Sequence, residues 1–195
     1  MKLLRVLFNA LLISLLFNSC CKSTLMEKYE FDNKDIDLLH YKKDGILSFE
    51  NEEGLIREVK VNFNEPFTTR DYACAECCEY DEYETIVCEL SFEEDSFILK
   101  LRMVKYDRTI FEIYSEDFRY NGYSTELGLD CNRDMFLEID SCRKGIFIGA
   151  DKYENVLDFY NYSEFAPNVT RVLFSEENGV EFVMFRDSTF LRLKK

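Results

Sequence analysis

The sequence predicts a mainly β protein: an antiparallel β-sandwich or rolled sheet of about ten short strands, preceded by a signal peptide and a tether. Short runs rich in β-branched and aromatic residues recur from Gly45 onward, and polar turns separate them. Residues 96–106 alternate apolar and polar side chains, which is the period of a strand with one face toward a core. No long segment has convincing helical periodicity.

The chain begins with the layout of a secretory signal. Lys2 and Arg5 precede an apolar run of twelve residues, Val6 to Phe17, that only two polar residues interrupt. This run is too short to span a bilayer, which takes a helix of about 20 residues. The alternatives to a lipoprotein signal are plain secretion with cleavage after Cys21, an uncleaved anchor, or a buried helix.

The end of the apolar run makes the signal more specific. Leu16-Phe17-Asn18-Ser19-Cys20 resembles the bacterial lipobox, in which a small residue precedes a cysteine that is lipidated before cleavage. Ser19 fits that pattern, whereas Phe17 and Asn18 depart from its commonest form. The resemblance implies that Cys20 becomes the acylated first residue of the mature chain. A lipid-bearing cysteine anchors a protein to a leaflet because each buried methylene contributes about 0.8 kcal/mol.

This reading gives a signal peptide over residues 1–19, a tether over 20–44 and a single disulfide-stapled β domain over 45–195. We expect one helical turn within the tether, near residues 35–40. We expect a cysteine-rich loop over residues 64–83. The predicted strands lie, in order, in residues 45–49, 55–63, 85–93, 96–106, 109–115, 135–140, 145–151, 170–175, 180–186 and 189–195.

The mature chain is strongly acidic. Removing residues 1–19 leaves 22 basic and 38 acidic side chains, a formal charge of −16. Such a surface repels nucleic acid and favours cationic partners. Ten carboxylates and no Lys or Arg lie between Asp71 and Leu99. This stretch indicates a surface for a basic protein or a calcium site, and its alternative interpretation is an ordinary solvated acidic face.

The cysteines point to disulfides, because exported thiols meet an oxidising space. Without Cys20 and its neighbour Cys21, an even set of six remains. Cys131 and Cys142 form the pair we expect first. Cys77 and Cys78 are adjacent and should take different partners, for which the nearest candidates are Cys74 and Cys88.

Other chemistries have weaker support. Zinc prefers two closely spaced ligand pairs, and only Cys74-x-x-Cys77 supplies one. Carboxylates around that motif oppose thiolate formation, so redox catalysis is disfavoured. Residues 130–134 have the opening spacing of a calcium loop, but positions six and twelve are Met135 and Ser141. Enzyme motifs are absent and His40 is the only histidine, so we expect no enzyme, no cofactor and no metal.

The closing segment, residues 171–195, is similar to the end of many small lipoproteins of Bacteroidota, a likeness that Phe174, Ser175, Gly179 and Val180 carry. The resemblance implies an envelope location and no activity. By the same analogy we expect the outer membrane, on its periplasmic face. Asp187-Ser188-Thr189 resembles the short O-glycosylation motif of exported proteins in that group, and its alternative interpretation is an ordinary turn.

The sequence therefore predicts a lipid-anchored envelope protein with a non-catalytic binding or structural role. The alternative is an acidic immunity or inhibitor protein that neutralises a basic toxin or hydrolase.

Overall fold

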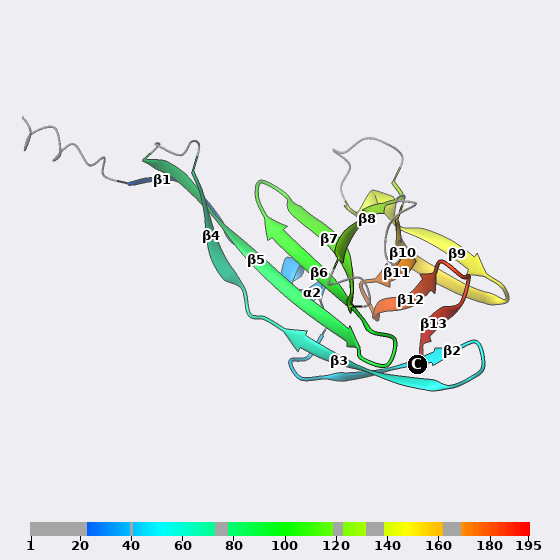
Figure 1. Cartoon of the computed structure of the whole chain (residues 1–195). Helices are drawn as coiled ribbons and strands as arrows, with labels where there is room; N and C mark the ends of the chain where they lie inside the picture. The colour runs from blue at the N-terminus through cyan, green and yellow to red at the C-terminus, as the bar shows by residue number, and fades with distance from the viewer. Residues whose placement is uncertain (1–22, 40, 73–77, 119–122, 132–138, 162–168) are drawn as a thin grey trace, which may run out of the picture.

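The computed structural model describes residues 23–39, 41–72, 78–118, 123–131, 139–161 and 169–195. These described residues are mainly β, with one short α-helix among them (Figure 1). The elements are β1 (Thr24–Tyr29), α2 (Asn33–Asp37), β2 (Ile46–Asn51), β3 (Ile56–Phe63), β4 (Phe67–Tyr72), β5 (Glu79–Phe92), β6 (Phe97–Lys105), β7 (Thr109–Asp117), β8 (Tyr123–Leu129), the 3₁₀ turn η2 (Ile139–Cys142), β9 (Lys144–Ile148), β10 (Asp151–Tyr160), β11 (Val169–Ser175), β12 (Gly179–Phe185) and β13 (Phe190–Leu193).

Ten of the strands form a sheet that rolls until it closes on itself. Its order is β5-β3-β2-β13-β12-β11-β10-β8-β7-β6, and β6 pairs with β5 to complete the ring. Every pairing around the ring is antiparallel. The predicted mainly β, antiparallel rolled sheet is therefore confirmed. Closure gives each ring strand a partner on both sides, so the ring has few free edges.

Alternating side chains fill the interior of this closed sheet. In β6, Phe97, Leu99, Leu101 and Met103 are at most 1% exposed, whereas the residues between them face outward or lie partly exposed. Aromatic rings contribute much of the core, and the rings of Phe92 and Phe97 stack with centroids 4.3 Å apart. The period of two predicted for this strand is thus confirmed, and burial of the apolar row stabilises the closed form.

Residues 31–39 and Tyr41 pack against the core from one end of the closed sheet. Asp32 caps α2, and its side chain and that of Asp35 form a reciprocal capping box. Leu39 is 3% exposed within the core, and Phe31 and Tyr41 pack against it. Part of the segment expected as a tether over residues 20–44 is therefore ordered, with β1, α2 and the buried Leu39 in it. The expected helical turn is present as α2.

A second, smaller apolar cluster lies outside the main core. The hairpin of β9 and β10 contributes Ile146, Tyr153 and Val156, which pack against Leu173 and Phe182 of β11 and β12. This cluster covers the outer face of those strands and explains why β12 is buried along most of its length.

The expected loop over residues 64–83 is wrong for its described residues, because β4 and the start of β5 lie in it. Residues 80–85 of β5 pair with β4 on one edge, and residues 79–83 pair with β1 on the other. This three-stranded unit, the arm, consists of β1, β4 and residues 79–85 of β5. In Figure 1 it projects away from the closed sheet.

Candidate functional site

The two faces of the arm carry different side chains. Residues directly opposite in register share a face, and successive residues of a strand point to opposite faces. Glu79, Asp81 and Tyr83 of β5 lie on one face, which Asp71 of β4 and Tyr29 of β1 share through their pairing with Asp81 and Tyr83. Tyr80 and Glu82 lie on the other face with their β4 partners, Tyr72 and Arg70.

Four carboxylates gather in a hollow of about 380 Å³ on the arm. The acidic hollow is lined by Met26, Glu27, Asp71, Glu79, Tyr80 and Asp81. A bulge in β1 between Leu25 and Lys28 brings Glu27 over β5, and the Glu27 backbone N–H donates to Asp81 Oδ1 at 3.2 Å. Asp71 and Asp81 face each other directly across β4 and β5. Like charges in that position repel each other, so the arrangement costs stability unless a cation neutralises it.

No lysine or arginine among the described residues forms an ion pair with Glu27, Asp71, Glu79 or Asp81. The opposite face differs, because Arg70 Nε lies 2.9 Å from Glu82 Oε1 and the Arg70 guanidinium stacks over the Tyr80 ring at 4.9 Å. The acidic hollow is therefore a patch of negative charge that the arm itself leaves uncompensated.

Tyrosine rings join the arm to the closed sheet. Tyr83 of β5 is 9% exposed, and its ring lies 4.7 Å from that of Tyr106, which follows β6. Tyr29 of β1 packs edge-on against Tyr106 at 6.4 Å. A hydrogen bond from the Tyr29 hydroxyl to Glu27 raises the pKa of Tyr29 to about 12, so the phenol stays neutral and adds no charge near neutral pH.

The arm also exposes apolar side chains beside the carboxylates. Leu25 and Met26 of β1 are 42% and 57% exposed, and Phe67 and Tyr72 of β4 are similarly open. Among the described strands, β1 and β4 each pair only with β5, so their outer edges have no strand partner. Exposed apolar side chains and free strand edges are typical of surfaces that bind another chain.

Of the predicted disulfides, the pair Cys131–Cys142 is confirmed, with Cα atoms 5.2 Å apart. The prediction that Cys88 enters a disulfide is wrong: its thiol is free. Cys88 lies in the same inward row of β5 as Leu90 and Phe92, is fully buried, and faces Leu101 of β6. Burial raises the pKa of its thiol to about 12, which keeps it protonated and unreactive.

Cys78 is disulfide-bonded, and its partner is none of the described cysteines. Cys20, Cys74 and Cys77 lie outside the described residues, so the predictions for them stay predictions. The inward alternation of β5 was the sequence signal that could have identified Cys88 as a core residue.

The remaining candidates are placed as follows. Most of the calcium-like segment, including Asn132 and Asp134, lies outside the described residues, and so does His40. Within the described ranges, no three His, Cys, Asp or Glu side chains come together as a metal-ion site. Asp187-Ser188-Thr189 forms the exposed turn between β12 and β13, and the Asp187 carboxylate accepts hydrogen bonds from both the backbone and the hydroxyl of Thr189.

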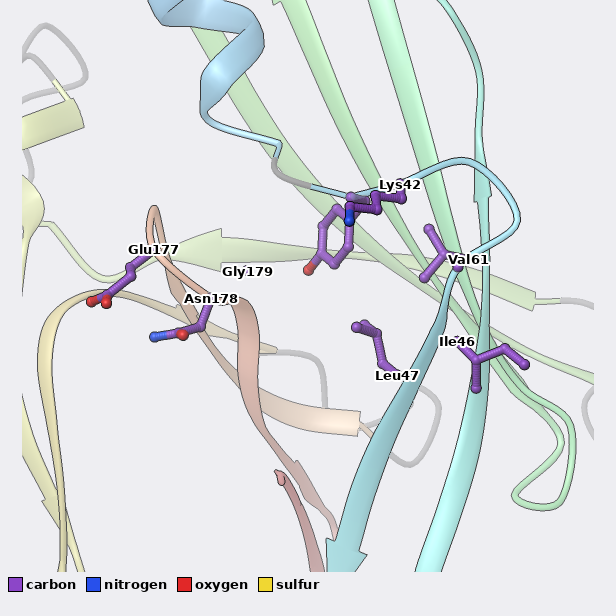
Figure 2. A pocket seen from close by; sticks show the side chains of 9 residues that line it. Lys42, Ile46, Leu47, Val61, Glu177, Asn178 and Gly179 are labelled. Carbon is purple, nitrogen blue, oxygen red and sulfur yellow. The ribbon is translucent and has the colours of Figure 1, made fainter. Parts of the chain in front are cut away.

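A second hollow, of about 260 Å³, lies between the start of β2 and the β11–β12 turn. In Figure 2, Leu47 and Val61 stand across from Asn178 and Gly179 of that turn. The Tyr41 hydroxyl reaches the turn and accepts a hydrogen bond from the Val180 backbone N–H at 2.6 Å. The described pairing of β12 with β13 runs from Phe182 to Met184 and does not include Val180. The Tyr41 hydroxyl gives the Val180 N–H a hydrogen-bond partner, and we interpret this contact as structural.

A buried charge cluster lies near the Cys131–Cys142 disulfide. Asp158 of β10 is 1% exposed and accepts two hydrogen bonds from Arg171, each 2.9 Å long. Lys144 lies 3.0 Å from Asp158 and 2.7 Å from Asp130. Two cations thus compensate one buried carboxylate, and the cluster links β8, β9, β10 and β11.

Comparison with known proteins found no match: no family model, curated protein or solved structure resembles the chain closely enough to count. In the part of the chain that the structure describes, no helix has the length and apolar character needed to cross a bilayer.

Proposed function

We propose that this chain is a lipid-anchored protein of the cell envelope that binds a basic protein partner through the acidic hollow of its arm, without catalysing a reaction. The observation that carries the proposal is the set of four carboxylates with no ion-pairing cation among the described residues. A cationic partner would relieve the repulsion between Asp71 and Asp81 and gain charge-assisted contacts.

The anchor in this proposal is Cys20, acylated after removal of residues 1–19, on the periplasmic face of the outer membrane. The apolar run, the small residue Ser19 and the short basic start support it. The partner's class follows from chemistry alone: a patch of lysines and arginines beside an apolar contact that fits Met26 and Phe67. A basic toxin or hydrolase that the protein neutralises is one such partner.

Co-purification from detergent-solubilised envelopes tests the binding role. We compare the wild-type chain with the triple variant Asp71→Asn/Glu79→Gln/Asp81→Asn. Loss of three partly exposed charge pairs should weaken binding roughly tenfold, because each contributes about 0.2–1 kcal/mol. Salt of about 0.5 M should release the partner, since screening then acts over a few Å.

The control is Glu52→Gln/Glu53→Gln, which removes two exposed charges from the turn between β2 and β3, outside the arm. It should retain the partner. If the arm variant captured as much partner as the wild type, the acidic hollow would be refuted as the binding surface. A partner that stays bound in about 0.5 M salt would refute it as well.

A further inference from the structure

The outer edge of β4 has no partner among the described strands. β4 pairs along its whole length with β5, from Phe67 opposite Thr85 to Tyr72 opposite Tyr80. Figure 1 shows it along one side of the arm, and none of its side chains is buried. A strand in this position presents a row of unpaired backbone N–H and C=O groups to its surroundings.

The direction of the backbone groups of β5 follows from one hydrogen bond. The Thr24 N–H donates to the Cys78 carbonyl at 2.7 Å, so the backbone groups of Cys78 point toward β1. Backbone groups of successive residues point to opposite sides of a strand. The residues of β5 whose backbone groups point toward β4 are therefore Asp81, Tyr83 and Thr85.

The register then shows which residues of β4 form the open edge. Directly opposite residues of an antiparallel pair exchange both of their backbone hydrogen bonds or neither. The β4 residues opposite Asp81, Tyr83 and Thr85 bond to β5, and they are Asp71, Thr69 and Phe67. The residues whose N–H and C=O groups point outward are Thr68, Arg70 and Tyr72.

β4 lacks the features that protect natural edge strands from pairing. Its register with β5 is continuous, and its sequence contains neither proline nor lysine. β1, on the other edge of the arm, has a bulge between Leu25 and Lys28 and carries that lysine. Bulges and lysines obstruct the addition of a strand. An extended chain therefore fits the edge of β4 better than that of β1.

Charge decides which extended chain fits. Asp71 lies on the face of the acidic hollow, directly opposite Asp81, so a strand added to β4 would place alternate side chains beside this pair. Lysine or arginine at those positions would neutralise both carboxylates. A second copy of this chain, with a formal net charge of −14, would instead add like charge.

We infer that an extended basic segment of the partner adds to the outer edge of β4 as a further strand, with its lysines or arginines over the acidic hollow. This inference rests on the proposed function, because the partner is the same. On the opposite face the segment lies beside Tyr72, which is 45% exposed, and Arg70, which already pairs with Glu82. Apolar side chains suit this face, so the segment alternates basic and apolar residues.

Amide hydrogen exchange tests the added strand on the full chain in detergent. The probe is a short synthetic peptide in which lysine alternates with valine. We expect the peptide to slow exchange at the outward N–H groups of Thr68, Arg70 and Tyr72. The same peptide with an N-methylated backbone has equal charge but cannot donate strand hydrogen bonds, and it should bind roughly tenfold more weakly. Unchanged exchange at the three residues overturns the inference.

Thr68→Pro removes one outward N–H and no hydrogen bond to β5. Proline is tolerated on an edge strand where its nitrogen faces solvent, so the variant should fold. It should bind the unmethylated peptide roughly tenfold more weakly than the wild type. The matched control is Leu25→Pro, which removes an outward N–H from β1 and should bind like the wild type. Equal binding by Thr68→Pro and by the wild type overturns the inference.

The variant Asp71→Asn/Glu79→Gln/Asp81→Asn separates the two proposals. If it loses the peptide while Thr68→Pro and N-methylation have no effect, the acidic hollow stands and strand addition is overturned. If it binds like the wild type while Thr68→Pro does not, the acidic hollow is refuted and strand addition stands. A wild-type dimer in sedimentation that Thr68→Pro dissociates would place a second copy on β4 and overturn the basic partner.

Discussion

The hydroxyl of Tyr41 accepts a hydrogen bond from the backbone N–H of Val180, 139 positions later in the sequence, at 2.6 Å. This bond joins the segment that packs against one end of the closed sheet to the first residues of β12. Burial raises the pKa of Tyr41, so its phenol remains protonated and uncharged over the physiological range.

Replacing Tyr41 by Phe removes the acceptor and leaves the Val180 N–H unpaired. We expect the free energy of unfolding to fall by about 1–3 kcal/mol, the cost of an unsatisfied buried polar group. Urea unfolding followed by circular dichroism measures it. Tyr80→Phe, on the half-exposed arm, should change stability by less than about 0.5 kcal/mol. An equal effect of the two substitutions would show that the hydrogen bond between Tyr41 and Val180 does not contribute specifically to stability.

Gly179 should not tolerate a side chain. Its φ is +73°, and an added Cβ would meet the Tyr41 phenol ring. We expect Gly179→Ala to destabilise by about 2–4 kcal/mol, since backbone strain and overlap add. Gly149 has a similar φ of +60° but open space around it, so Gly149→Ala isolates the backbone cost at about 1 kcal/mol. Thermal unfolding of both variants compares them, and equal losses would refute the overlap.

Asp158→Asn should be among the most destabilising charge removals in the chain. It leaves Arg171 and Lys144 without their shared buried carboxylate, and the expected loss is about 2–4 kcal/mol. Asp151→Asn, which breaks the more exposed 2.9 Å pair with Arg192, should cost less than about 1 kcal/mol. Chemical unfolding of the two variants tests this ranking, and a reversed order would contradict it.

Asp35 should make stability depend on pH in the acid range. Burial would raise the pKa of its carboxyl, but hydrogen bonds from Lys105, Thr109 and the Asp32 backbone outweigh burial and lower the pKa below 3.8. The stabilisation is therefore complete above about pH 4 and is lost as pH falls through the lowered pKa.

Asp35→Asn should cost about 1–2 kcal/mol near pH 7, the contribution of hydrogen bonds to a charged group. The difference from wild type should shrink below about pH 3. Urea unfolding across pH measures it, with the exposed Asp37→Asn as the control. A difference that stays constant down to pH 2 would contradict the ionised role of Asp35.

The sequence allowed the strands with one buried face to be predicted, and it did not reveal the arm. In β6, the row from Phe97 to Met103 alternates because one face meets the core. The arm residues Glu79–Glu82 are polar and aromatic on both faces and none of them is buried, so no period of two marks them as a strand. β1 could not be predicted for the same reason, because five of its six residues are exposed.

Of the candidate site, the sequence showed only that many carboxylates lie close together along the chain. The run of carboxylates from Asp71 to Leu99 was evident, but its division into a paired and an unpaired face depends on the register that sets Asp71 opposite Asp81 and Arg70 opposite Glu82. Ring closure likewise depends on the pairing of β5 with both β3 and β6, which no local pattern specifies.

Intact mass spectrometry of the membrane-extracted chain, alkylated without reduction before and after unfolding, tests the central claim most directly. The account predicts a chain without residues 1–19, with acyl groups on Cys20, and with Cys88 protected from alkylation in the native state but alkylated after unfolding. An unacylated chain that retains residues 1–19 and carries several alkylated thiols would contradict the anchor and the oxidising compartment together.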